Sequence, residues 1–261
     1  MAVKIKRIYK GVGFLNIFGM SDIGKKRKSN QDTFSYLKLS EDVCFAFACD
    51  GMGGQNGGDV ASEMAKNLLH KKIYNALNID IELITDEYVK AVVANCFEEV
   101  NVDIFEKSES CLGYKGMGTT CVMAVVVKDS LFVFSVGDSR VYLYSDCVLK
   151  QLTKDHSYVQ TLVDSGKITK EEAKFHPRKN EITKAIGVSK NRVDVDVSVF
   201  KIGYKDVILL CTDGLTNSCS DSKLKEILKN RLGIDSCVKD FIDVSNANGG
   251  YDNVTAVLIE I

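Results

Sequence analysis

Several features that mark particular protein classes are scarce or missing in this 261-residue chain. Tryptophan is absent and proline occurs once, so proline-rich linkers are excluded. The longest apolar runs, such as Cys121–Val127, are far too short to cross a bilayer, so we expect no membrane partner. Neither sign of charge predominates, with 34 basic and 35 acidic residues, and this balance argues against nucleic acid as a partner. The 45% of hydrophobic residues suffice for the full core of a globular protein.

The nine cysteines form no C-x-x-C pair and show no spacing typical of a zinc site. Four of them, Cys44, Cys49, Cys121 and Cys211, lie inside apolar runs, where we expect buried, reduced thiols. The basic N-terminal decapeptide is followed by a glycine-broken segment without a clean cleavage site, so we expect no signal peptide. These features favour a cytoplasmic protein.

Hydrophobic periodicity predicts many strands and a few helices. Apolar residues at helical spacing predict helices over 58–77 and 86–107. Short apolar runs with tight links then predict an antiparallel meander over 120–152. Strict alternation of valine predicts a half-buried strand over 193–199. Apolar runs predict two more strands, over 207–211 and 254–259. Between the strands 207–211 and 254–259 we expect a helix over 224–232 that Gly233 ends.

Residues 155–183 do not follow this strand rhythm. Val159, Leu162 and Val163 suggest a short helix, and Thr169 with Glu172 forms a capping box that begins another. We expect a compact helical insert, called the flap below, within a single domain. The fold class is predicted to be α+β, with antiparallel strands in two sheets and helices on the outside.

The aspartates at the strand ends carry most of the functional information. Asp50, Asp138 and Asp213 each follow an apolar run, Asp252 precedes one, and each has a glycine nearby. Taken singly, such an aspartate most often marks a turn. If the strand ends converge, the carboxylates repel one another, and hard divalent cations relieve that repulsion. An all-oxygen ligand set favours Mg²⁺ or Mn²⁺ over zinc.

Eight segments in a fixed order make the chain recognisable. It resembles the metal-dependent protein phosphatases, the type 2C serine/threonine phosphatases or PPM family, in their small bacterial form, from about Ser21 to Ile259. Any one segment could arise by chance, whereas eight in order are a strong signal. The segments are SDIGKKRKSNQDTF (21–34), ACDGMGGQNGG (48–58), GMGTT (116–120), VGDSRVYLY (136–144), LTKDHS (152–157), HPRKNEITKAIG (176–187), LLCTDGLTN (209–217) and GGYDNVT (249–255).

The resemblance implies a four-layer α-β-β-α sandwich that forms one phosphatase domain over 1–261, and a centre of two Mn²⁺ or Mg²⁺ ions. By this resemblance Asp50 bridges the ions, the Gly51 carbonyl is a backbone ligand, and Asp213 and Asp252 supply further carboxylates. Asp138 with Asp213 matches the ligands of a third, weaker ion.

Two further residues have roles by the same resemblance. Asp32 matches the acidic residue that holds a metal-bound water, and Arg27 matches the arginine that grips the substrate phosphate. A planar guanidinium suits that task because it binds two phosphate oxygens at once. The implied reaction is hydrolysis of phosphoserine and phosphothreonine by in-line attack of a metal-bridging hydroxide. No cysteine is followed by arginine six residues later, so a thiol nucleophile is rejected.

The proton donor and the substrate contacts stay open. Met52 stands where eukaryotic relatives often carry histidine, so a metal-bound water is our first choice of acid, with His156 and His176 as candidates that are more often structural. The flap lies beside the active site in relatives, which makes His176 and Arg178 candidate substrate-binding residues. A surface salt bridge is an equally good interpretation of Arg178.

Alternative functions are an inactive or regulatory phosphatase-like binding protein and a metal-dependent hydrolase of small phosphoesters. The presence of all five aspartates favours an active enzyme. The resemblance implies phosphoserine or phosphothreonine proteins as partners, together with a cognate eukaryotic-like Ser/Thr kinase. We expect a monomer.

Overall fold

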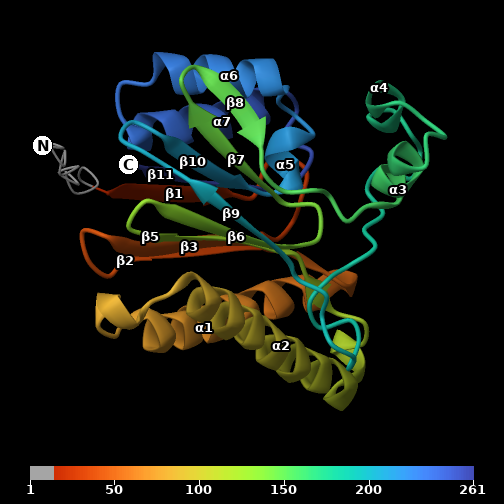
Figure 1. Ribbon diagram of the computed structural model, residues 1–261. Coiled ribbons are helices and arrows are strands. Elements are labelled where there is room, and N and C mark those ends of the chain that lie inside the picture. Colours follow the sequence, from red (N-terminus) through yellow and green to blue (C-terminus); the bar gives the residue numbers. More distant parts are fainter. Residues whose placement is uncertain (1–14) are drawn as a thin grey trace, which may run out of the picture.

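The computed structural model describes residues 15–261, apart from the side chains of residues 54–56, and it contains two antiparallel five-strand paths that face each other (Figure 1). The N-terminal segment, in which we expect no signal peptide, lies largely outside the described residues. The first sheet has the order β1 (Asn16–Asp22), β11 (Val254–Glu260), β10 (Val207–Cys211), β7 (Arg140–Ser145) and β8 (Val148–Gln151). The second has the order β2 (Asp32–Lys38), β3 (Val43–Met52), β5 (Cys121–Val127), β6 (Ser130–Val136) and β9 (Asp196–Lys201), and β4 (Gly118–Thr119) pairs with β3.

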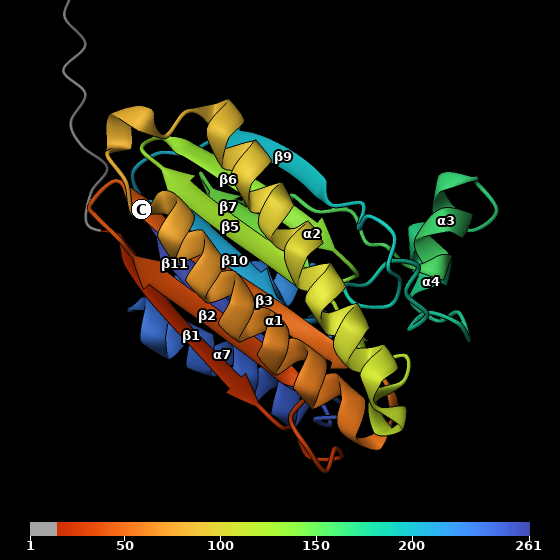
Figure 2. The ribbon, with the colours of Figure 1, turned by 90° about the horizontal axis from the view of Figure 1, so that it is seen from below.

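Helices cover the outer face of each sheet, which gives the four-layer α+β sandwich expected from the sequence (Figures 1 and 2). The second sheet is covered by α1 (Gly54–Leu77) and α2 (Asp86–Ser110), and the first by α6 (Asp221–Asn230) and α7 (Ile234–Ala247). Shorter helical turns are η1 (Ile81–Leu83), η2 (Leu112–Tyr114) and α5 (Asp213–Thr216). Within residues 15–261, none of the helices has the length and apolar character that a bilayer crossing needs.

Strand β3 shows how the sequence builds these layers. Its side chains alternate between two faces, so Phe45 and Phe47 pack under α1 and α2. Cys44, Ala46 and Ala48 instead pack against the first sheet. Because both faces are buried, the strand is a continuous apolar run rather than an alternating one. The expected burial of Cys44, and of the other three cysteines in apolar runs, is confirmed.

The prediction for the C-terminal helices was wrong in one respect. The helix over 224–232 exists as α6, but Gly233 does not terminate it, and a second helix, α7, follows at once. Gly233 has an extended backbone with φ of −164° and is the N-cap of α7, while Leu232 is 99% exposed between the two helices. A glycine without a left-handed conformation is not a helix C-cap.

The alternating segment 193–199 is a strand only in its second half, because β9 begins at Asp196. Val193 instead packs into the core under α1 and α2. The flap contains the two expected helices, α3 (Tyr158–Asp164) and α4 (Lys170–Ala173), and both hydrogen bonds of the Thr169–Glu172 capping box are present. In both ribbon views the flap projects from the sandwich (Figures 1 and 2).

Candidate active site

Five aspartates from both sheets gather at one end of the sandwich. Asp32 begins β2 and pairs directly with Asp50 in the register of β2 and β3. Asp138 lies in the turn between β6 and β7, which belong to different sheets. Asp213 begins α5 two residues after β10, and Asp252 lies two residues before β11. We call this group the five-aspartate cluster.

The other four carboxylates lie close enough to Asp50 to act on its charge. Burial raises the pKa of Asp50 well above its ordinary value, and the negative charges of Asp32, Asp213, Asp138 and Asp252 raise it further. The pairing of Asp32 with Asp50 and the contact between the Asp213 and Asp252 turns bring these strand ends together.

Three other members of the cluster have raised pKa values for the same two reasons. Burial, followed by repulsion from Asp213, raises the pKa of Asp138 to about 8. Burial raises the pKa of Asp213 to about 6, with repulsion from Asp252 adding to it and a hydrogen bond with Asp50 opposing it. Burial also raises the pKa of Asp32 to about 7, against the hydrogen bonds that its carboxylate accepts. Such a cluster is costly to ionise unless positive charge enters it.

Two threonine hydroxyls hold Asp32 in place. The Thr212 and Thr255 hydroxyls lie 2.7 and 2.8 Å from Oδ2 of Asp32 and donate to it. The backbone N–H of Thr255 also donates to the Thr212 hydroxyl, at 3.0 Å. These contacts fix the carboxylate in one rotamer and leave its buried Oδ1 without a hydrogen-bond donor.

The oxygen chemistry of the cluster fits hard divalent cations. Oδ1 of Asp32 and Oδ1 of Asp213 are both buried and without a hydrogen-bond donor, and unpaired buried oxygens of this kind suit a cation. Oδ2 of Asp213 accepts a hydrogen bond of 2.9 Å from the Asn217 amide. In the described part of the chain, however, no three His, Cys, Asp or Glu side chains are close enough to form a preassembled metal cage. The cluster thus supplies suitable ligands without a finished coordination sphere.

Glycines allow the turns of the cluster to pack backbone against backbone. A Cβ on Gly51 would lie 1.9 Å from the carbonyl oxygen of Gly58 at the start of α1. A Cβ on Gly214 would lie 1.9 Å from the carbonyl oxygen of Asn253. Both positions therefore require glycine, and the second contact brings the Asp213 turn against the Asp252 turn.

Arg27 is the cationic side chain at the edge of the cluster. Its Nη2 lies 2.7 Å from Oδ2 of Asp252, and the two side chains are 47% and 31% exposed. The positive charge of Arg27 also opposes the rise in the pKa of Asp213. A half-exposed guanidinium beside buried carboxylates can reach a phosphate that arrives from solvent.

The base of the flap is fixed by Asp155 and His156. Arg140 makes a bidentate ion pair with Asp155, whose shortest contact is 2.7 Å. Nδ1 of the buried His156 accepts a 3.0 Å hydrogen bond from the Gly137 N–H, and its Nε2 faces Asp196 at 3.2 Å. The hydrogen bond at Nδ1 favours a structural role for His156, while its buried Nε2 makes no hydrogen bond and has Asp196 as its acidic neighbour.

The other two flap residues singled out in the sequence lie beyond this base. Arg178 makes an ion pair with Glu181 and stacks over the ring of Tyr158, with 3.6 Å between the guanidinium carbon and the ring centre. Nδ1 of His176 accepts a hydrogen bond from the Arg178 N–H. Both residues follow α4 on the projecting flap (Figure 1), and their contacts lie within the flap.

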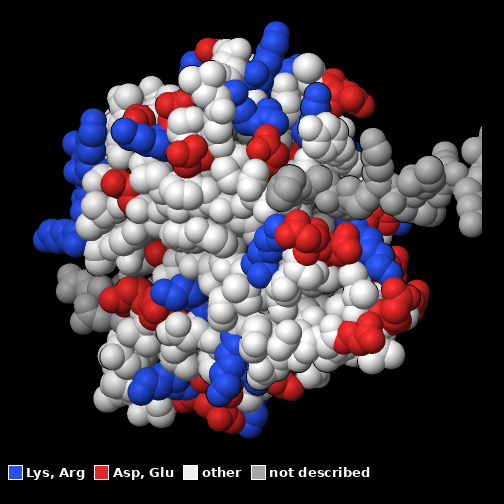
Figure 3. Space-filling model, turned by 90° about the vertical axis from the view of Figure 1, so that its left-hand side faces the viewer, with Lys and Arg blue, Asp and Glu red and all other residues white. Residues whose placement is uncertain are grey.

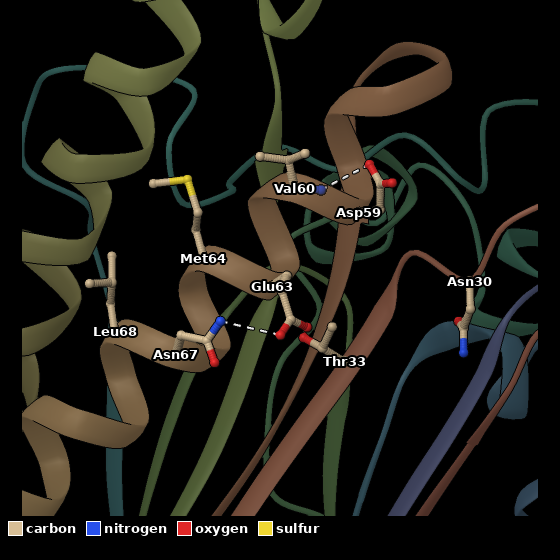
Figure 4. A pocket seen from close by; sticks show the side chains of 8 residues that line it. All are labelled: Asn30, Thr33, Asp59, Val60, Glu63, Met64, Asn67 and Leu68. Carbon is tan, nitrogen blue, oxygen red and sulfur yellow. Dashed lines mark hydrogen bonds between the residues drawn. The ribbon is translucent and has the colours of Figure 1, made fainter.

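A surface groove of about 590 Å³ runs along α1 beside the cluster (Figure 4). Asn30 and Thr33 flank Asp32 in sequence and form one side of the groove, and Asp59 and Glu63 of α1 form part of the other. None of the five clustered aspartates lines it. The chemistry of the clustered carboxylates, rather than the size of this groove, identifies the candidate site.

Sequence reasoning did not assign roles to Thr212, Thr255 or Asn253. All three occur in recognised segments, directly before or shortly after an aspartate of the cluster. The structure identifies them by their burial: Thr212 and Thr255 are fully buried and Asn253 is nearly so, and a buried polar side chain needs a hydrogen-bond partner.

Comparisons with known proteins agree with one another. The profile of the family "Protein phosphatase 2C" matches residues 21–258. The serine/threonine phosphatase stp of Listeria monocytogenes serotype 4b is 40% identical over 240 residues, which cover 92% of this chain and 93% of that protein. A solved serine/threonine phosphatase from S. agalactiae superposes with a TM-score of 0.87 at 33% identity, covering 95% of this chain and all of the other. Serine/threonine phosphatase Stp1 from Staphylococcus aureus gives a TM-score of 0.86 at 32% identity, over 98% of both chains.

Proposed function

This chain belongs to the protein phosphatase 2C family and is a protein serine/threonine phosphatase, and we propose that the five-aspartate cluster is its active site. The observation that carries the proposal is the burial of several mutually repelling carboxylates around Asp50, with unpaired oxygens on two of them. The family is metal-dependent, and the oxygen ligands fit Mn²⁺ or Mg²⁺.

The family resemblance assigns the ligands of the ions. Asp50, the Gly51 carbonyl, Asp213 and Asp252 would hold two ions, and Asp138 with Asp213 would hold a third. When bound, such ions supply Lewis acidity and a nucleophilic water at neutral pH. The raised pKa values of Asp50, Asp138 and Asp213 support these assignments, because cations would offset the repulsion that raises them.

The other residues position the substrate and water. Arg27 would bind two oxygens of the substrate phosphate, and Asp32, oriented by Thr212 and Thr255, would accept a hydrogen bond from the attacking water. His156 is buried and its Nδ1 is engaged by the Gly137 N–H, which supports water, rather than this histidine, as the acid that protonates the leaving oxygen.

Substrates, partners and location complete the proposal. The enzyme acts on phosphoserine and phosphothreonine proteins, with a cognate eukaryotic-like Ser/Thr kinase as the source of its substrates. It works in the cytoplasm as a monomer, in which residues 1–261 form one phosphatase domain. Two residues of the flap (155–183), His176 and Arg178, would contact protein substrates. The exposure of Arg178 to solvent supports this, and His176 next to it is half-buried.

The test is phosphate release from a phosphothreonine peptide and a matched phosphotyrosine peptide, with Mn²⁺ or with EDTA. We expect rapid release from phosphothreonine only, dependent on Mn²⁺. Asp213→Asn should lower turnover by more than about a hundredfold, because it removes a proposed metal ligand. Asp243→Asn, on the exposed face of α7, is the matched control and should act like the parent enzyme. Full activity in EDTA, or in Asp213→Asn, would contradict the proposed site.

A further inference from the structure

The loop between β1 and β2 carries four consecutive cationic residues, Lys25, Lys26, Arg27 and Lys28, which we call the basic loop. We propose that the basic loop binds acidic side chains that flank the phosphorylated residue of the protein substrate. This inference rests on the proposed function, since it assigns a substrate class to the same site. Arg27 would take the scissile phosphate, and the three lysines would take neighbouring carboxylates.

One face of the basic loop is bonded to the turn that carries Asp252. The backbone N–H groups of Lys25 and Lys26 donate to the Gly250 carbonyl oxygen at 2.7 and 3.1 Å. Gly24 has a φ of +77°, and a Cβ there would lie 2.3 Å from the Asp252 carbonyl oxygen. The two turns therefore pack directly against each other, which keeps the cations at the edge of the five-aspartate cluster.

Both ends of the basic loop are held by one buried amide. Nδ2 of Asn253 donates to the carbonyl oxygens of Ile23 and Ser29, at 2.9 and 3.0 Å. Its Oδ1 accepts a hydrogen bond of 2.9 Å from the Gln31 N–H. Because the backbone is already ordered, binding of a peptide does not have to pay the entropy of ordering the loop.

The three lysines are available to a ligand. Lys25, Lys26 and Lys28 are exposed, and no ion pair engages them among residues 15–261. Arg27, in contrast, already contacts Asp252. Unpaired cations around a phosphate-binding arginine attract anionic groups on either side of the phosphate.

The excess of positive charge at the basic loop is local, because basic and acidic residues are nearly equal in number over the whole chain. The net charge of the chain is −1, and the face in Figure 3 carries basic and acidic side chains interspersed. A short cationic loop beside a site for a single phosphate suits a short acidic peptide, whereas nucleic-acid surfaces need a longer basic stripe. An acidic phosphoprotein segment is therefore the occupant that the charges favour.

The experiment uses two phosphothreonine peptides of equal length, one with Asp and Glu on both sides and one with Asn and Gln instead. With the Mn²⁺-loaded enzyme we expect kcat/KM to be higher for the acidic peptide, through a lower KM. The triple variant Lys25→Gln/Lys26→Gln/Lys28→Gln should reduce this preference about eightfold, since an exposed ion pair changes binding roughly twofold. Salt should weaken the preference of the parent enzyme.

The matched control is Lys225→Gln/Lys229→Gln/Lys239→Gln, which removes the same charge from exposed positions on α6 and α7. It should keep the preference of the parent enzyme. Equal kcat/KM for both peptides, or an equal loss of preference in the two triple variants, would overturn the inference and leave the phosphatase function standing. No release from either peptide would overturn the proposed function and this inference with it.

Discussion

At the residue scale, Arg27 shows how one side chain serves two partners. Its Nη2 contacts Asp252, while nearly half of the side chain stays exposed to solvent, from which the proposed phosphate would arrive. A guanidinium can do both because its five N–H donors point in fixed directions. The ammonium group of a lysine has a single centre of charge, so it cannot bind the carboxylate and two phosphate oxygens at the same time.

We therefore predict that Arg27→Lys raises KM for a phosphothreonine peptide by about tenfold and lowers kcat by much less. The reason is that the variant keeps the positive charge and loses bidentate docking of the phosphate. Steady-state kinetics with saturating Mn²⁺ measure both constants. An unchanged KM would count against this role.

Individual residues also show what the sequence could not reveal. Thr212 precedes Asp213 at the start of α5, which by pattern is an N-cap. In the structure it is the N-cap residue, but its side chain makes no capping hydrogen bond, because the hydroxyl points to Asp32, to which it donates, and accepts from the Thr255 N–H instead. That partner lies 180 positions away, so only the folded chain brings the two together. Strand ends and glycines mark four of the aspartates locally, whereas Asp32 was assigned only by the family resemblance.

At the scale of elements, the site depends on turns that touch. The Asp213 turn and the Asp252 turn meet where Gly214 faces the Asn253 carbonyl. Sequence patterns identify such glycines but do not say what each one faces. The error at Gly233 has the same origin, because a glycine after a helix can end that helix or precede the next one, and its dihedral angles decide.

We predict that Gly214→Ala separates these two turns. The added Cβ would overlap a backbone oxygen, which cannot rotate away, so we expect a loss of about 1–3 kcal/mol in unfolding free energy and a large loss of activity. Urea unfolding and phosphate release measure the two effects. Gly113→Ala is the matched control, since a Cβ there meets no atom within 4 Å. Equal stability of the two variants would refute the steric argument.

At the scale of the whole molecule, the layers followed from the sequence more readily than the site did. Strands buried on both faces, such as β3 and β5, are continuous apolar runs, and helices with one apolar side must lie outside them. The convergence of the carboxylates depends instead on pairing between distant strands, such as the register that places Asp32 opposite Asp50. Local patterns do not determine that register.

The buried aspartates predict how stability depends on pH. Their folded pKa values of about 7 for Asp32, 8 for Asp138 and 6 for Asp213 lie above the unfolded value of about 3.9. The folded state therefore holds more protons on these groups, so their contribution to stability is fully present below pH ~4 and is lost as pH rises through the folded values.

We expect the melting temperature of the EDTA-treated protein to fall between about pH 4 and 8, and Mn²⁺ to reverse the loss by offsetting the negative charge. The gap between the two conditions should widen with pH. Calorimetry or thermal fluorescence measures it. In Asp213→Asn, which removes one of the titrating groups, the EDTA curve should be flatter. Parallel curves with and without Mn²⁺ would exclude this linkage.

The five-aspartate cluster draws Asp32 and Asp50 from one sheet and Asp213 and Asp252 from the other. Between the sheets lies a layer of small and aliphatic side chains, including Ala46 and Val257. Any slippage of one half of the sandwich over the other would pull the cluster apart while each half kept its own helices and core. With the active site proposed at this cluster, enzymatic activity would therefore be lost on such slippage before the secondary structure of either half is lost.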